Sequence, residues 1–225
     1  HEVAQGYKDV KDLTCVAKFK VADGQKFDKD TYILAWTTTP WTLPSNLALC
    51  VNKSYEYAEV KANIGTDDEP VYENYILAKD LLETVLKETP YDVVKTFKGE
   101  EVKGVQCRHP FLERNSVVVL GGEDGVNVTL EEGTGAVHTA PGYGKEDYLQ
   151  SLKDGLEIKV AVNDKGVQTE EAGPFAGMYY AKSNKEITKW LEENGYLLKA
   201  VKLVHSYPHC WRCKNPIIFR ATPQW

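Results

Sequence analysis

Strand-like segments dominate the pattern of hydrophobic and polar positions along the chain. They are short runs rich in β-branched and aromatic residues, and polar or glycine-containing turns separate them. Ten segments fit this description: residues 13–20, 31–39, 47–51, 55–60, 71–77, 91–97, 116–120, 136–139, 158–162 and 201–206. So many short strands predict a β-barrel or a folded sheet.

Two helices are predicted from capping boxes, in which Ser or Asp precedes Glu by three positions. Asp80 and Glu83 would begin the first helix, and Ser183 and Glu186 would begin the second. Gly195 would end the second helix, because glycine readily adopts the left-handed conformation found just after helices.

A third helix is predicted to begin near Lys145. Its apolar residues Tyr148, Leu149 and Leu152 fall on one face, and Gly155 would close it. Helices therefore interrupt the strands. The predicted class is α+β or mixed, with a β-barrel-like core of many short strands and about three peripheral helices.

The length of 225 residues suits a single domain spanning residues 1–225. The chain begins with His1 and stops just past a dense motif, so we expect a segment of a longer protein. Residues 1–12 and 206–225 would then connect this domain to the remainder.

Charge and composition narrow the classes of function. The net charge of −6 argues against a strongly basic nucleic-acid binder but permits a local basic groove. No apolar run approaches the roughly 18 residues of a membrane span. The odd count of five cysteines, with no visible signal peptide, predicts a reducing, cytoplasmic setting.

The most unusual stretch is Trp-Thr-Thr-Thr-Pro-Trp-Thr-Leu-Pro-Ser-Asn at residues 36–46. In a strand, Thr37 and Thr39 would point to one face and Thr38 to the other, and Pro40 would end the strand. Clustered hydroxyls can hold a ribose, an ester carbonyl or a water. The alternative is an ordinary threonine-rich strand with a proline turn.

A second signal lies in residues 133–148, which predict a glycine turn, a short strand, a loop and a helix start. Asp147 falls in the first helical turn, where the helix dipole favours an ionised carboxylate that suits an ammonium group. Asp147 could instead merely cap the helix. His138 could be a core histidine or a general acid or base.

Cys210 and Cys213 form one C-x-x-C pair, which is half of a tetrahedral zinc site. His205 is a possible third ligand, whereas His209 directly precedes Cys210 and is a poor one. A complete site would need a partner pair from outside this chain. A structural role without metal and a redox role are the alternatives.

At this point the motifs carry a resemblance. Residues 36–46 resemble the threonine-rich signature of the editing domain of class I aminoacyl-tRNA synthetases, and residues 133–148 resemble its second signature. Residues 207–213 and 220–225 resemble the return into the synthetase core. The Thr-Thr-Thr-Pro-Trp-Thr form is similar to that of isoleucyl enzymes. The rest of the sequence, including residues 1–7, resembles eukaryotic cytosolic members of this family.

The resemblance implies post-transfer editing, in which valine misattached to isoleucine tRNA is hydrolysed by direct attack of water on the ester. It implies the site residues Trp36, Thr37, Thr38, Thr39, Thr42, Asn46, His138 and Asp147, of which Thr38, Thr39, His138 and Asp147 are the candidate catalytic residues. Asp147 would hold the α-ammonium group. The threonines would contact the terminal adenosine, the ester and the water, and His138 would line the side-chain pocket.

The resemblance further implies partners and cofactors. The partners are the aminoacylated 3′ end of isoleucine tRNA, valine and the remainder of the synthetase, with no membrane. Editing needs no cofactor, ATP and magnesium belong to the catalytic core, and zinc at the cysteine pair stays open. The competing hypotheses are a non-catalytic module that binds the tRNA acceptor end and a structural insertion. The intact threonine run and Asp147 favour hydrolysis.

Overall fold

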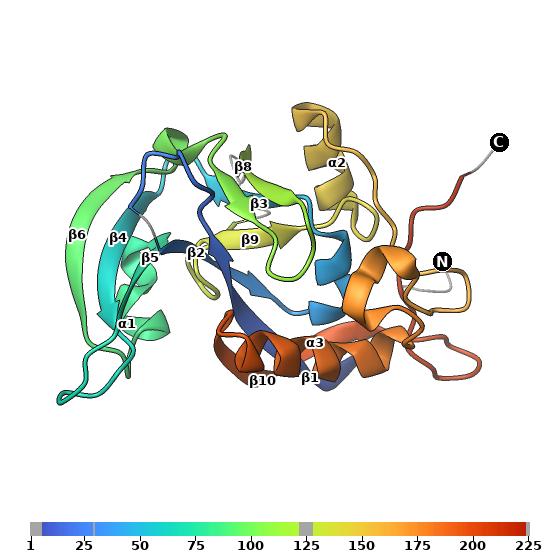
Figure 1. Ribbon diagram of the computed structural model, residues 1–225. Coiled ribbons are helices and arrows are strands. Elements are labelled where there is room, and N and C mark those ends of the chain that lie inside the picture. The colour runs from blue at the N-terminus through green and yellow to red at the C-terminus, as the bar shows by residue number, and fades with distance from the viewer. Residues whose placement is uncertain (1–5, 29, 122–127, 224–225) are drawn as a thin grey trace.

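The computed structural model describes residues 6–28, 30–121 and 128–223 of the chain. Its strands form one strongly curved sheet of ten strands, and its helices pack around that sheet (Figure 1). The predicted α+β class with a curved, many-stranded core is therefore confirmed. None of the helices in these ranges has the length and apolar character needed to cross a membrane.

The strands are β1 (Tyr7–Lys20), β2 (Thr31–Thr37), β3 (Ala48–Asn52), β4 (Glu56–Asn63), β5 (Tyr72–Ala78), β6 (Tyr91–Lys98), β7 (Gln106–Arg108), β8 (Asn115–Gly121), β9 (Ala136–Thr139) and β10 (Leu197–Pro208). The helices are α1 (Leu82–Val85), α2 (Lys145–Asp154) and α3 (Tyr180–Glu193). Short 3₁₀ segments are η1 (Pro40–Ser45), η2 (Lys79–Leu81), η3 (Gly99–Val102) and η4 (Glu170–Phe175).

The sheet order is β6-β4-β5-β2-β9-β3-β8-β7, and β1 pairs with both β2 and β10. This order places β9 between β2 and β3. Trp36 on β2 is paired with Val137, and Leu49 on β3 is paired with His138. The two sequence motifs therefore become neighbours at the centre of the sheet.

The core is apolar and lies under the curve of the sheet. Its largest fully buried side chains include Phe19, Leu34, Tyr57, Tyr75 and Ile187. Burial of such side chains supplies the main favourable free energy of folding, roughly 1.5–3 kcal/mol for each large apolar residue. The central strands are buried on both faces, so the site residues on them rest on a rigid support.

The long pair β1 and β10 closes the domain at one side. Tyr7 is paired with Pro208, so the start of β1 lies next to the end of β10. The predicted connecting roles of residues 1–12 and 206–225 stay predictions.

The predicted strand at residues 158–162 is wrong. In this segment Val162 forms only an isolated bridge, with Gln168. The amides of Ala161 and Val162 donate instead to the side chains of Ser45 and Tyr143, at 3.0 Å and 3.2 Å. Side-chain acceptors replace the strand partner that an alternating sequence would otherwise need.

Both predicted capping boxes are also wrong. Ser183 lies inside α3, where its hydroxyl donates to the Tyr180 carbonyl at 2.7 Å. Asp80 lies within η2, and no side chain caps that turn. The predicted helix stops are confirmed, because Gly155 and Gly195 have φ of 66° and 78°.

The apolar face predicted for α2 does not pack on the core. Tyr148, Leu149 and Leu152 are exposed, whereas Gln150 and Ser151 are buried. The buried side of α2 is polar because Gln150 donates to the Leu120 carbonyl at 3.0 Å and Ser151 to the Tyr148 carbonyl at 2.6 Å.

Candidate functional site

The threonine-rich segment leaves the sheet as a tight turn. β2 ends at Thr37, and the Thr37 hydroxyl accepts a hydrogen bond from the Thr39 amide at 3.1 Å. Pro40 then begins η1, where a residue without an N–H is tolerated. The expected end of the strand before Pro40 is confirmed, although the strand stops two residues earlier than predicted.

A chain of hydrogen bonds joins this turn to β9. The Asn46 side-chain amide donates through Nδ2 to His138 Nδ1 at 2.8 Å. His138 Nε2 lies 2.8 Å from the Thr42 hydroxyl. The Thr42 hydroxyl donates to the Thr39 carbonyl at 2.9 Å. Because Nδ1 accepts, Nε2 carries the proton, and the ring is held in one neutral tautomer.

Burial and the nearby Arg114 charge lower the pKa of His138 to about 3. Both ring nitrogens are also engaged. This geometry favours a fixed wall over a group that carries protons at neutral pH. The Thr39 hydroxyl lies 3.3 Å from the Thr42 hydroxyl. In the described chain, the half-buried Thr38 hydroxyl has no hydrogen-bond partner and is available to a ligand.

Asp147 lies in the first turn of α2, as the sequence predicted. Its Oδ2 accepts a hydrogen bond from the Ala140 amide at 2.8 Å, and Ala140 follows His138 by two residues. Burial raises the pKa of Asp147 to about 6, against the lowering effect of that amide. Desolvation therefore outweighs the helix dipole in setting this pKa, while a value of about 6 still leaves the carboxylate mostly ionised near neutral pH, as expected.

The glycines before β9 serve the packing of the sheet. Gly133 and Gly135 have φ of 83° and 80°, a conformation that other residues rarely adopt. A Cβ at Gly135 would lie 2.4 Å from the Ala78 Cβ, and one at Gly133 would lie 3.1 Å from the Trp36 ring. The close backbone approach that these glycines permit is thus made to the protein itself.

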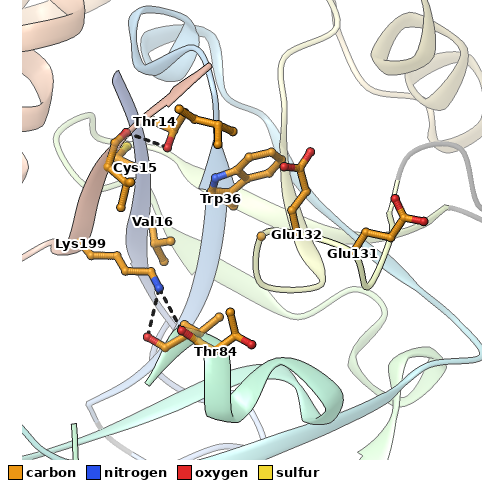
Figure 2. A pocket seen from close by; sticks show the side chains of 12 residues that line it. Thr14, Cys15, Val16, Trp36, Thr84, Glu131, Glu132 and Lys199 are labelled. Atoms are coloured by element: carbon orange, nitrogen blue, oxygen red, sulfur yellow. Dashed lines mark hydrogen bonds between the residues drawn. The ribbon is translucent and has the colours of Figure 1, made fainter. Parts of the chain in front are cut away.

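The two tryptophans of the motif have different environments. Trp41 is buried and packs edge-on against Tyr143 and Tyr180, with ring centroids 5.0 Å and 5.1 Å away. Trp36 is half-buried and borders a hollow of about 210 Å³, which Figure 2 shows together with Glu131 and Glu132. Trp36 is therefore available to a ligand, and Trp41 is not.

The cysteines form no complete metal site in the described residues. Cys210 and Cys213 lie on a turn, and no set of three or more His, Cys, Asp and Glu that could hold a metal occurs there. His205, the suggested third ligand, lies on β10 with Nε2 3.9 Å from the Asp12 carboxylate. Hydrogen bonds from the Cys213 and Arg212 backbone lower the pKa of Cys210. The pair could supply two zinc ligands, and zinc binding stays a prediction.

The remaining cysteines are poor nucleophiles. Burial raises the pKa values of Cys15, Cys50 and Cys107 to about 12. Their thiols therefore stay protonated at neutral pH.

The structure brings together Thr37, Thr39, Thr42, Asn46 and His138 through the bonds described above. Asp147 joins them through the Ala140 amide. Sequence reasoning missed the polar side chains that hold η1 from outside: His109, Arg114, Gln168 and Asn184. Each of these residues lies in a loop or helix outside any recognisable sequence motif, so no local pattern indicated its role.

Comparison with known proteins identifies homologues over nearly the whole chain. The isoleucine–tRNA ligase of Petrotoga mobilis is 49% identical over 201 residues, which are 88% of this chain and 21% of that protein. The ligases of Caldicellulosiruptor bescii and Bacillus anthracis are 45% and 48% identical, each over 97% of this chain. The chain spans 21–24% of the length of these relatives. No family model matches the chain.

Solved structures with the same fold are editing domains. The structure named GlLeuRS-CP1 has a TM-score of 0.63 and 14% identity, and covers 84% of this chain and 98% of its own. The editing domain of Plasmodium knowlesi cytosolic leucyl-tRNA synthetase has a TM-score of 0.60 and 13% identity, over 91% of this chain and 99% of its own. The ligase relatives named above are bacterial, and the predicted eukaryotic origin of this chain stays a prediction.

Proposed function

Since this chain is a homologue of one segment of the isoleucine–tRNA ligases and has the fold of synthetase editing domains, we propose that it hydrolyses valine misattached to isoleucine tRNA. A binding pocket separates isoleucine from valine by only about 1–3 kcal/mol, and the handling of this pair by isoleucyl-tRNA synthetase is the standard illustration of that limit. A second, hydrolytic site would correct the resulting errors. The substrate is the valyl ester at the 3′ end of the tRNA.

One observation carries the proposal. A set of polar side chains that are already hydrogen-bonded to one another lies near a carboxylate that has no cationic partner among the described residues. Thr42, His138 and Asn46 are bonded to each other around the end of β2. Asp147 is tied to Ala140 on the same strand-and-loop segment and has a raised pKa. An aminoacyl ester has a free ammonium group and an uncharged ester beside it, which match these two parts.

Asp147 would bind the α-ammonium group. In the described residues, no cationic side chain forms an ion pair with Asp147, and burial disfavours its charge. An arriving ammonium would restore the ionised form, since an opposite charge within about 4–6 Å lowers a carboxylate pKa by one to three units. Part of the binding free energy would thus come from a charged group that free tRNA lacks.

The hydroxyls of Thr38 and Thr39 would orient the attacking water and the ester. The water oxygen bonds to the ester carbonyl carbon, the bond to the ribose oxygen breaks, and that oxygen takes a proton. Valine and free tRNA are the products. No Ser-His-Asp set is assembled around these residues in the described chain, and an ester is activated enough for positioned water to suffice.

His138 would act as a wall that limits side-chain size. Its ring is fixed by two hydrogen bonds of 2.8 Å each, so it cannot turn away easily to admit a longer side chain. Trp36 and Thr37 would support the adjoining surface. Editing by this site would need no cofactor. ATP and magnesium would belong to the parts of the ligase outside this chain, and we place the protein in the cytoplasm.

The test is deacylation of valyl-tRNA for isoleucine, with isoleucyl-tRNA as the cognate control. The assay is run on this chain and on a complete ligase that contains it. We expect the wild type to release valine and to spare isoleucine. Asp147→Ala is expected to lower kcat/KM for the valyl ester by about 100-fold or more, because a charge-assisted bond in a part-buried site is lost.

Two results would overturn the proposal. One is a complete ligase that does not release valine while this segment still binds the tRNA end, which would leave a non-catalytic binding module. The other is full activity of Asp147→Ala, which would remove the carboxylate from the site. Glu146→Ala, on the neighbouring exposed position of α2, is the matched control and is expected to retain activity.

A further inference from the structure

The segment that bears Thr42 is short. η1 comprises six residues, two of them prolines that lack an N–H, and its two ends are closed by backbone bonds of 2.9 Å from the Thr42 amide to the Thr39 carbonyl and from the Asn46 amide to the Leu43 carbonyl. A turn this short is marginal in isolation. Its geometry must therefore be set by contacts from elsewhere.

Two side chains hold the peptide groups of Trp41. Gln168 Nε2 donates to the Trp41 carbonyl at 2.8 Å, and the Trp41 amide donates to Asn184 Oδ1 at 2.8 Å. Gln168 comes from the loop before η4, and Asn184 comes from α3. The carbonyl and the N–H of Trp41, the residue before Thr42, are thus both held by side-chain amides from distant parts of the sequence.

Two further side chains hold the far end of η1. His109 Nε2 donates to the Leu43 carbonyl at 2.8 Å, while its Nδ1 accepts from the Leu112 amide at 3.2 Å. The Arg114 guanidinium donates to the Asn46 carbonyl at 3.1 Å and also to the Pro44 carbonyl. The Leu43 carbonyl also accepts the Asn46 backbone amide, whereas Arg114 supplies donors for the Pro44 and Asn46 carbonyls at the end of the helical turn.

We infer that His109, Arg114, Gln168 and Asn184 are positioning residues that hold η1 in place and so set the discrimination between valine and isoleucine. The inference rests on the function proposed above. The four side chains do not touch the substrate. They act through Thr42, whose hydroxyl meets the His138 ring that would limit the size of the side chain.

Gln168 shows that this arrangement has a cost. Its side chain is 2% exposed, and its Oε1 has no hydrogen-bond partner among the described residues. A buried polar atom without a partner costs about 1–3 kcal/mol, which an apolar side chain of the same size would avoid. Packing alone would therefore favour Met or Leu. An amide gives two bonds that Met cannot give, one to the Trp41 carbonyl and one to the Ser183 hydroxyl.

The test compares Gln168→Met with Ser183→Ala in the full 225-residue chain. Ser183 accepts the other Gln168 N–H bond, at 3.1 Å, so its loss leaves the Trp41 contact intact. The first readout is hydrogen exchange of the Thr42 and Asn46 amides, with the amides of β4 as reference. The second is hydrolysis of valyl and isoleucyl esters of isoleucine tRNA, and the third is Tm.

We expect Gln168→Met to speed exchange at Thr42 and Asn46 at least tenfold and to leave β4 unchanged. We expect kcat for the valyl ester and the valine-to-isoleucine ratio each to fall about tenfold, since displacement of a site by 1 Å costs up to about 100-fold. KM should stay within twofold, and Tm should not fall. Ser183→Ala should match the wild type in exchange at these two amides and in selectivity.

Unchanged exchange at Thr42 and Asn46 in Gln168→Met would overturn the inference, whatever the activity. Faster exchange with unchanged selectivity would overturn the link from η1 to discrimination. If neither the wild-type chain nor a complete ligase that contains it released valine, the proposed function would fail, and with it the role in discrimination. The exchange data would then still decide whether Gln168 positions η1.

Discussion

His138 and Asp147, which lie in the two halves of the site, differ in how completely their side chains are hydrogen-bonded. On the η1 side, the His138 ring is bonded at both nitrogens, and it stays neutral down to a pH of about 3. On the α2 side, Asp147 has a single backbone donor and a pKa of about 6. The difference teaches that the His138 ring is fixed before a ligand arrives, whereas Asp147 gains an ionic partner only when a cation binds.

The largest expected effect on selectivity comes from removing the His138 ring. His138→Ala should let the isoleucyl ester be hydrolysed, with the valine-to-isoleucine preference falling about 10-fold or more, the range that one methylene is worth in a pocket. Deacylation of both esters measures this preference. His205→Ala on β10 is the matched control and should keep the preference.

The same variant separates two roles for His138. A wall residue leaves hydrolysis of the valyl ester largely intact. A general acid or base would instead cost roughly 10²–10⁴-fold on the valyl ester itself. Loss of that size, after correction for any unfolded fraction, would contradict the comparison between the two halves.

A smaller expected effect is the pH dependence that Asp147 gives to the reaction. kcat/KM for the valyl ester should fall about tenfold per pH unit below the Asp147 pKa of about 6, because the protonated carboxyl cannot pair with the ammonium. A pH profile between 4.5 and 8 measures it. His109 and His138 both have pKa values lowered to about 3, so they do not titrate in this window. An inflection near 6 that persists in Asp147→Asn would assign the titration to another group.

The smallest effect concerns stability. The folded pKa of Asp147 is raised above its ordinary value of 3.8, so its contribution favours folding below pH 4 and is lost as pH rises through about 6. Asp147→Asn should therefore be more stable than the wild type at pH 8, by about 1–2 kcal/mol because the side chain is partly open to solvent. The advantage should vanish near pH 4. Urea unfolding at both pH values tests this, and a destabilised variant at pH 8 would contradict it.

The sequence predicted much of the sheet because its strands are regular. Residues 136–139 and 91–97 were placed within one residue of β9 and β6, where β-branched and aromatic residues lie between clear turns. It failed at residues 158–162, where the side chains of Ser45 and Tyr143 take the backbone bonds of a strand partner. These partners lie 19 and 116 positions away, beyond any local pattern.

The candidate site was predictable only in part, for a similar reason. The motifs named Thr42, Asn46 and His138, and the structure joins them by hydrogen bonds. The direction of the Asp147 pKa shift was not predictable, because the helix dipole can be inferred from sequence position and burial cannot. Gln168 and Arg114 were missed because each acts on η1 across 70 or more positions.

The most direct test of the account is the pKa of the Asp147 carboxyl, followed by carbon-13 NMR in the free chain and with a non-hydrolysable amide analogue of valyl-adenosine. The account predicts a pKa of about 6 in the free chain and a fall of one to three units with the valyl analogue. The isoleucyl analogue should cause no fall. A free pKa near 3.8, or one that the valyl analogue leaves unchanged, would contradict the claim that Asp147 is reserved for the ammonium group of the misattached amino acid.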